Sequence, residues 1–261
     1  MRLSPAAVFD PMRWLHLLSF VLLSCSSAKP ATSALDPAVT SLVIEVDYVP
    51  TAKPTSGRGQ PLFQLTRSNL ERLFNDTSVK VTIPSSDGDM EQLSDVTATT
   101  FSSDEMLAIA DKHRNQKGTS SSVTFYVVFL DGYFKDSSGT RNDVLGVSLG
   151  NTGVIGMFKP VMDSVGATGK LPVATANFAG ETTLIHELSH AIGLVNNGIA
   201  LKSEHQDTAN GKHCNNSECI MYYSNEGVDS LREFITRAVK DGNTVLFDSA
   251  CLADIDAAKK K

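Results

Sequence analysis

The sequence predicts an α+β fold with a mixed sheet, a helix that carries the pair His186 and His190, and a small irregular C-terminal part. Three observations support this fold class. Strand-like and helical patterns alternate between residues 41 and 158. Residues Ser122–Leu130 are almost continuously apolar, as in a central strand buried on both faces. Around the His pair, apolar residues recur at i, i+4, i+7 and i+11, which predicts a helix docked on a core: Leu184, Leu188, Ala191 and Val195.

The remaining elements follow from alternation, helical spacing and turn residues. The predicted strands are Ser41–Val49, Val79–Ile83, Ser122–Leu130 and a strand pair within Val144–Phe158, split at Gly150–Gly153. The predicted helices, besides the one with the His pair, are Arg67–Phe74, Asp104–Arg114, Leu231–Val239 and Phe247–Ile255. Residues Asp136–Asp143 are rich in residue types common in loops, so we predict a loop there.

Size and charge limit the possible classes of protein. The chain has 261 residues and a formal net charge of −6, with no basic cluster, so nucleic-acid binding is not expected. The roughly 220 residues after residue 40 are enough for one domain with a good-sized core. We place this domain at 41–261, with an upper part at about 41–193 and a lower part at about 194–261.

The N-terminal segment predicts export. The apolar run Trp14–Leu23 is too short to cross a bilayer, which needs about 20 residues, but it suits a signal peptide over residues 1–24. A signal peptide begins with a short basic region, and Met12-Arg13 can supply it. We therefore expect translation to start at Met1 or at Met12.

The end of that segment, Leu22-Leu23-Ser24-Cys25, resembles a bacterial lipobox. The resemblance implies cleavage before Cys25, a lipid on its thiol and membrane association through that lipid. The small-residue stretch 25–40 then reads as a flexible tether. We expect an outer-membrane lipoprotein of a Gram-negative bacterium, or alternatively a secreted or periplasmic protein.

Residues 186–193 read His-Glu-Leu-Ser-His-Ala-Ile-Gly and predict a metal site. On a helix, His186 and His190 lie one turn apart and can reach the same cation. Glu187 is turned roughly 100° from His186, so it can act on a water at that cation without being a ligand. Paired surface histidines also occur by chance. The apolar stripe and the helix-ending Gly193 favour zinc (Zn²⁺) over coincidence.

Zinc in a hydrolase takes a third protein ligand, and the sequence offers more than one. Metzincin peptidases place a third His ten residues after the first, but here that position holds Asn196. The next candidates are His205 and His213, and Asp207 could serve as a carboxylate ligand or as a partner of either imidazole.

The segment from His213 to Met221 favours His213 over His205 and Asp207 as the third ligand. This segment reads His-Cys, then four residues, Cys, one residue and Met. It resembles the stretch of archaemetzincins that runs from the third ligand to the methionine turn. The interval from His213 to Met221 also resembles the equivalent interval in matrixins. The chain is therefore similar to metzincins, with an insertion of Val195–Lys212 before the third ligand, and the likeness covers 181–223. It implies a metzincin-like mixed sheet with an active-site helix. It also implies zinc on His186, His190 and His213, Glu187 as general base, and Met221 beneath the metal.

Cys214, Cys219 and Cys251 leave two alternatives open. Archaemetzincins hold a second, structural zinc with cysteines in this region and a later Cys-x-x-Cys, but here only Cys251 lies downstream. Export instead favours one disulfide and one buried thiol.

The resemblance implies a zinc metalloendopeptidase whose substrate is a peptide or protein. An extended substrate would pair with an edge strand within Leu145–Phe158. Two alternatives remain: a lipid-anchored surface protein that keeps the metal site but binds ligands without cleaving them, and an amidase that acts on cell-wall peptides.

Overall fold

The computed structural model describes residues 33–56, 60–75, 77–167 and 174–259. The predicted signal peptide, Cys25 and the first part of the predicted tether lie outside these residues and stay predictions. Residues 33–40 form two turns, and Ala34 and Val39 are buried in the core. Packing thus begins before the predicted boundary at Ser41.

The main sheet confirms the predicted α+β class. Its strands run in the order β2-β1-β5-β9-β8, and β3 pairs with β1. The bounds are β1 Ser41–Tyr48, β2 Lys80–Thr82, β3 Glu91–Gln92, β5 Ser122–Leu130, β8 Gly146–Ser148 and β9 Val154–Phe158. All these pairs are parallel except β8–β9, which is antiparallel. The sheet is therefore mixed, and β8 is an edge strand.

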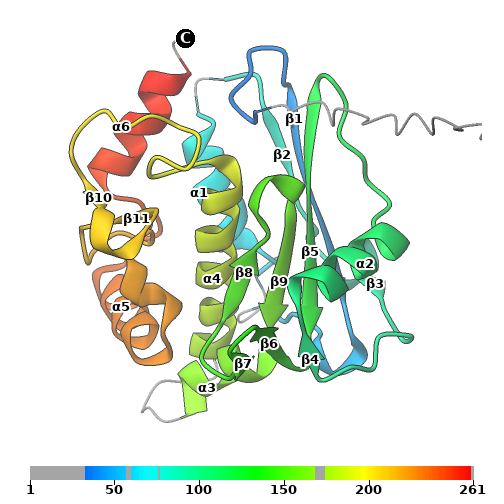
Figure 1. Cartoon of the computed structure of the whole chain (residues 1–261). Helices are drawn as coiled ribbons and strands as arrows, with labels where there is room; N and C mark the ends of the chain where they lie inside the picture. Colours follow the sequence, from blue (N-terminus) through cyan, green and yellow to red (C-terminus); the bar gives the residue numbers. More distant parts are fainter. Residues whose placement is uncertain (1–32, 57–59, 76, 168–173, 260–261) are drawn as a thin grey trace, which may run out of the picture. The chain divides into compact units, whose positions relative to one another are not determined.

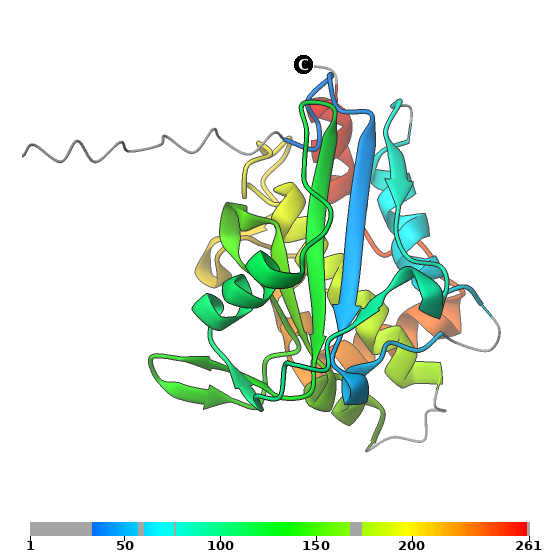
Figure 2. The same ribbon diagram turned by 90° about the vertical axis from the view of Figure 1, so that its right-hand side faces the viewer.

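The long strands β1 and β5 form the middle of this sheet and pair over their whole shared length (Figure 2). Residues 124–130 of β5 are all buried, as expected for a strand covered on both faces. The predicted strand pair in Val144–Phe158 is confirmed as the β8–β9 hairpin, with a short 3-10 helix, η3 (Gly150–Thr152), at the predicted split.

Helices cover both faces of the sheet. Helix α2 (Ser103–His113) packs against β9 on one face and begins with a capping box, in which Glu105 accepts from the Ser102 N–H at 2.7 Å. Helices α1 (Gln64–Leu73) and α4 (Ala174–Ile192) pack together on the other face (Figure 1). Helix α3 (Lys159–Ala167), which the sequence did not predict, packs against α4.

A second small sheet joins β4 (Thr100–Phe101), β6 (Tyr133–Asp136) and β7 (Gly139–Arg141). The prediction of a loop over Asp136–Asp143 is therefore wrong in part, because β6 and β7 form an antiparallel hairpin there. Residues 136–140 are exposed, so no buried alternation marks the strand in the sequence.

The C-terminal part lies on the side of α4 away from the sheet (Figure 1). It contains the short pair β10 (Gln206–Asp207) and β11 (His213–Cys214), helices α5 (Val228–Asp241) and α6 (Ser249–Ala258), and 3-10 turns η4 (Thr208–Asn210) and η5 (Tyr223–Glu226). The inward face of α5 carries Leu231, Phe234, Ile235 and Ala238. Val239, the last residue of the predicted helix, is 58% exposed.

Two further 3-10 turns, η1 (Pro50–Ala52) and η2 (Asp87–Asp89), lie between strands of the main sheet. In the part of the chain that the structure describes, no helix combines the length and apolar character needed to cross a membrane.

Candidate metal centre

Helix α4 carries three residues of the site: His186, Glu187 and His190. Leu184, Ile185 and Leu188 are fully buried and hold the helix in the core. One turn apart on the same helix, His186 and His190 turn their rings toward the C-terminal part, with ring centroids 4.7 Å apart. The sequence predicted this pairing from helical spacing alone.

Gly193 ends the helix and directs the chain away from the sheet. Its φ of +110° suits a residue without a side chain, and its N–H donates to the carbonyl of Ser189 at 3.0 Å. Asn196, at the position where metzincins carry the third His, donates to the Gln206 side chain at 3.0 Å. The loop that follows brings in a later histidine instead.

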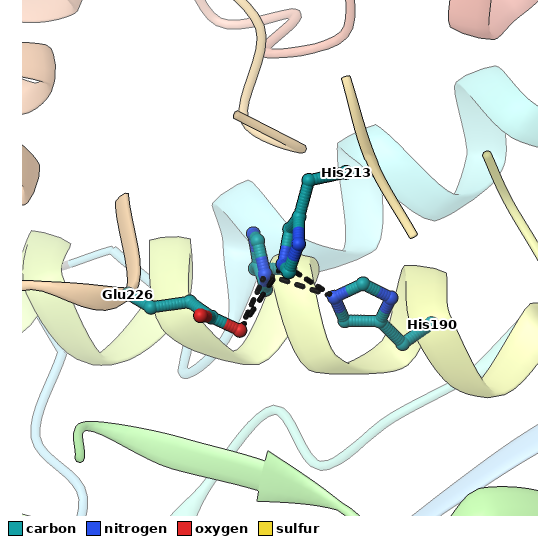
Figure 3. A group of neighbouring side chains, drawn as sticks. His190, His213 and Glu226 are labelled. Carbon is teal, nitrogen blue, oxygen red and sulfur yellow. Dashed lines mark hydrogen bonds and ion pairs between the residues drawn. The ribbon is translucent and has the colours of Figure 1, made fainter. Parts of the chain in front are cut away.

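His213 completes the cluster of imidazoles. It lies on β11, and its Nε2 is 3.2 Å from Nε2 of His190, which in turn is 3.0 Å from Nε2 of His186 (Figure 3). The structure thus brings together the three histidines that the sequence and the family resemblance selected. Atoms bound at about 2 Å to one tetrahedral zinc lie roughly 3.3 Å apart, which is close to these separations.

Hydrogen bonds fix the tautomers of two of these rings. Nδ1 of His186 lies 2.8 Å from the Ile220 carbonyl, and Nδ1 of His213 lies 2.6 Å from the Asn210 carbonyl. A carbonyl oxygen only accepts, so each of these Nδ1 atoms carries a proton, and in the neutral form of each ring Nε2 presents a lone pair.

When the rings are neutral, the three Nε2 atoms therefore meet with at most one proton among them. His190 Nε2 can carry one proton and can donate to only one of its two neighbours. A cation in the middle would satisfy all three lone pairs at once. The donor set thus fits zinc, which takes imidazole nitrogen readily.

The turn before η5 supports this arrangement. The Ile220 carbonyl accepts from His186 and also from Asn225 Nδ2 at 3.2 Å, and Met221, the next residue, is fully buried. The Met221 carbonyl accepts from the Cys214 N–H at 2.7 Å, so the methionine segment is tied to the strand that carries His213.

Glu226 is the member of the site that sequence reasoning missed. Its Oε1 lies 3.1 Å from His213 Nε2 and 3.7 Å from His186 Nε2 (Figure 3). One donor atom from each of His186, His190, His213 and Glu226 lies within 4.8 Å of the others. No motif marks this glutamate, and its only signal is a carboxylate shortly after the methionine.

The charges of the site act on one another. Burial tends to lower the pKa of His186, but the Glu226 carboxylate, 3.7 Å from its Nε2, and the charge of Glu187 outweigh burial and raise this pKa. Burial and the neighbouring imidazoles hold the pKa of His190 well below its usual value. Burial alone would raise the pKa of Glu226, but the nearby rings of His186 and His213 prevail and lower it.

Glu187 lies beside the cluster, on the side of the sheet edge. It is 5% exposed, and burial raises its pKa to about 7. The charge of His186 and a hydrogen bond from the Ser148 N–H of β8 act in the opposite direction and lower this pKa. A Cβ on Gly146, also in β8, would lie 2.9 Å from Thr183 Cγ2 and 3.0 Å from Glu187 Cγ. The glycine therefore lets the strand approach the helix at Glu187.

A cleft of about 710 Å³ opens at this point. His186, Glu187 and Glu226 line it, together with β8 and the first turn of α5. The cluster is therefore accessible to a molecule in the cleft, as a catalytic metal site requires.

The alternative third ligands lie elsewhere. His205 is buried and its Nε2 bonds to Asp254 Oδ2 at 2.7 Å. Asp207 accepts from the Ala209 N–H and from Asn210 Nδ2. Neither belongs to the His186 group.

The three cysteines form a second group that could hold a metal. Cys214, Cys219, Cys251 and Asp248 each offer a donor atom within 4.8 Å of the others. Sγ of Cys219 and Sγ of Cys251 are 3.6 Å apart, against about 2 Å in a disulfide, and all three thiols are free. The alternative of a disulfide among these three cysteines is therefore not found.

This thiol group is buried and mutually hydrogen-bonded. Asp248 Oδ1 caps α6 by accepting from the Cys251 N–H, and its Oδ2 accepts from Cys214 Sγ at 3.4 Å. Bonds from the other two thiols lower the pKa of Cys214, whereas burial raises the pKa of Cys219. Thiolates and one carboxylate fit a closed structural zinc site.

Comparisons with known proteins give a distant likeness. No protein family model and no curated protein matches this chain. An archaemetzincin from Methanopyrus kandleri is similar at 14% identity, covering 86% of this chain and 97% of that one, with a TM-score of 0.40. A zinc-dependent peptidase from Methanocorpusculum labreanum is similar at 13% identity, covering 81% of this chain and 99% of that one, with a TM-score of 0.43. At these values, the case for a function rests on the side chains of the cleft.

Proposed function

We propose that this chain is a zinc-dependent endopeptidase. One observation carries the proposal: three imidazole Nε2 atoms converge at the edge of an open cleft, beside a buried carboxylate on the same helix. His186, His190 and His213 would hold the zinc ion, and Glu187 would act as the general base.

The chemistry divides between the metal and the chain. When bound, zinc supplies a Lewis acid that acidifies a water molecule and polarises a carbonyl group. Glu187 takes the proton of the attacking water on its carboxylate and delivers it to the leaving amine. Glu187 is 5% exposed and lines the cleft beside His186, so it is placed to accept a proton from a water at the metal and to donate it to a leaving amine.

The edge strand supports a peptide as the substrate. β8 is the last strand of the main sheet, and Gly146 and Val147 line the cleft. An extended peptide that adds to such an edge is held by main-chain hydrogen bonds, whatever its sequence. This placement would bring a scissile carbonyl next to Glu187.

The thiol group would hold a second, structural zinc. Cys214, Cys219 and Cys251 are fully buried, and Asp248 supplies a fourth donor, so this position has no room for a substrate. The family resemblance offered such a site as one of two alternatives, and the chain lacks the later Cys-x-x-Cys of that family.

Two alternatives keep the metal but change the function. A surface protein that only binds ligands would not need a buried base beside the cation, so Glu187 argues against it. An amidase acting on cell-wall peptides would use the same residues, and only its substrate would differ.

The test is digestion of a peptide library by the full chain, with and without a zinc chelator. We expect peptide-bond cleavage that stops with the chelator and returns when zinc is added. A zinc-loaded protein that cleaves no peptide would refute the proposal. Release of product only from cell-wall fragments would assign the amidase.

A further inference from the structure

The fourth donor at the His cluster differs from the other three in how it is held. His186 and His213 are each anchored through Nδ1 by a main-chain carbonyl. Among the residues described, the side chain of Glu226 contacts His213 and His186 and makes no other hydrogen bond or ion pair. Its position therefore depends on the cluster alone.

Exposure separates Glu226 from the imidazoles as well. Its side chain is 53% exposed, against 4% for His186 and 11% for His213. Glu226 also lines the cleft beside His186, so a molecule that enters meets this carboxylate. Its own solvation would offset much of the cost of leaving the cluster.

The main chain beside Glu226 is fixed. Asn225, the preceding residue, is 5% exposed, and its Nδ2 donates to the carbonyls of Cys219 at 3.0 Å and Ile220 at 3.2 Å. The glutamate can therefore leave by rotating its side-chain bonds, without movement of η5. Such rotations of exposed side chains are fast compared with turnover.

We propose that Glu226 is an exchangeable fourth ligand, which closes the coordination of the metal in the resting protein and is displaced when a substrate enters the cleft. This inference rests on the proposed zinc site. A zinc ion with four protein ligands is typical of structural sites, whereas a catalytic ion keeps one position open. An unanchored carboxylate in that position gives a site that is closed at rest and opens for substrate.

The proposal implies a competition for one position. A small zinc-binding compound must displace the Glu226 carboxylate before it can bind. Removal of that carboxylate should therefore strengthen its binding, while the three histidines retain the ion.

The test uses the full chain loaded with Co²⁺ in place of zinc, as wild type and as the variants Glu226→Gln and Glu226→Ala. Glu218→Gln, which removes the charge of an exposed glutamate outside the cleft, is the matched control. The readouts are metal content, the visible spectrum as a difference between variant and wild type, and the affinity for acetohydroxamate. The thiol group contributes equally to both spectra and cancels in the difference.

We expect each Glu226 variant to keep its metal, to show a changed cobalt spectrum and to bind acetohydroxamate about tenfold or more tightly than wild type. The control should match wild type in all three. Unchanged spectra and affinities would show that Glu226 is not a ligand. Loss of the cluster ion would show a permanent ligand. Either result overturns the proposal.

These readouts need no peptide, so they separate this inference from the proposed function. If the Glu226 variants show a changed spectrum and tighter acetohydroxamate binding but the protein cleaves no peptide, Glu226 is an exchangeable ligand and the proposed peptidase activity is refuted. If the protein cleaves peptides but the Glu226 variants show no change in spectrum or affinity, the peptidase is supported and the exchangeable ligand is refuted.

Discussion

Two donor clusters lie next to each other in this molecule and differ in almost every chemical respect. The first presents imidazole nitrogens and a half-exposed carboxylate at the edge of a cleft. The second presents three fully buried thiols and the helix-capping Asp248. Exposure and donor type together distinguish a site suited to reaction from one suited to holding the fold together.

Adjacent residues connect the two clusters. His213 belongs to the first and Cys214 to the second, because successive side chains of strand β11 point in opposite directions. The third histidine is therefore positioned by a strand whose next residue is held by the thiol group. Changes in each cluster should separate the two roles.

Replacement of Glu187 by Gln should have the largest effect. The amide keeps the size of the side chain but cannot take the water proton, so we expect peptide turnover to fall by about 10³–10⁴-fold. Metal content should stay at the wild-type value in both clusters. Peptide cleavage rates and elemental analysis measure the two effects, and Glu233→Gln on the exposed face of α5 is the control. Near-normal cleavage by Glu187→Gln would exclude this residue as the base.

Replacement of His213 by Ala should remove the cleft metal. One of three imidazole donors is lost, so we expect zinc affinity at this cluster to fall by about 100-fold or more. His205→Ala is the comparison, because His205 bonds to Asp254 and lies 4.0 Å from Cys251 Sγ, outside the His cluster. Zinc titration of both variants decides the ligand. Loss of the cleft zinc from His205→Ala alone would reverse the assignment.

Replacement of Cys251 by Ser should act mainly on stability. It removes one buried sulfur donor, so we expect loss of the structural zinc and a melting temperature several degrees lower. Because Cys214 neighbours His213, the cleft cluster should also bind zinc more weakly, to a smaller degree than in His213→Ala. Thermal unfolding with and without chelator measures this effect. If the melting temperatures of variant and wild type still differ by the same amount after all metal has been removed, the thiols stabilise the fold through packing and not through a metal.

Replacement of Gly146 by Ala should have the smallest effect. The added methyl group would push on Glu187 Cγ and Thr183 Cγ2, so we expect turnover to fall by about tenfold with metal retained. Gly88→Ala, at a position where a Cβ has space, is the control. Equal turnover in the two variants would show that the close approach of β8 does not position the base.

The helix-borne half of the site could be predicted from the sequence, because helical spacing fixes where His186, Glu187 and His190 lie relative to one another. The third histidine lies beyond a long loop, where spacing carries no geometric information. His213 was selected through its likeness to a known segment and not through periodicity.

Glu226 and Asp248 could not be predicted. Each reaches its cluster through tertiary packing, Glu226 from the end of the 3-10 turn η5 and Asp248 from the N-cap of helix α6, and no local pattern marks either of them. The same reason explains the missed hairpin β6–β7, whose residues 136–140 are exposed and show no apolar alternation. Buried periodic elements were predictable, whereas loops that converge in space were not.

Anomalous diffraction at the zinc absorption edge, from crystals of the full chain, would locate the metal directly. We expect one peak among His186, His190 and His213, with a second, separate peak among Cys214, Cys219 and Cys251. A zinc-loaded protein with no peak at the three histidines would contradict this expectation.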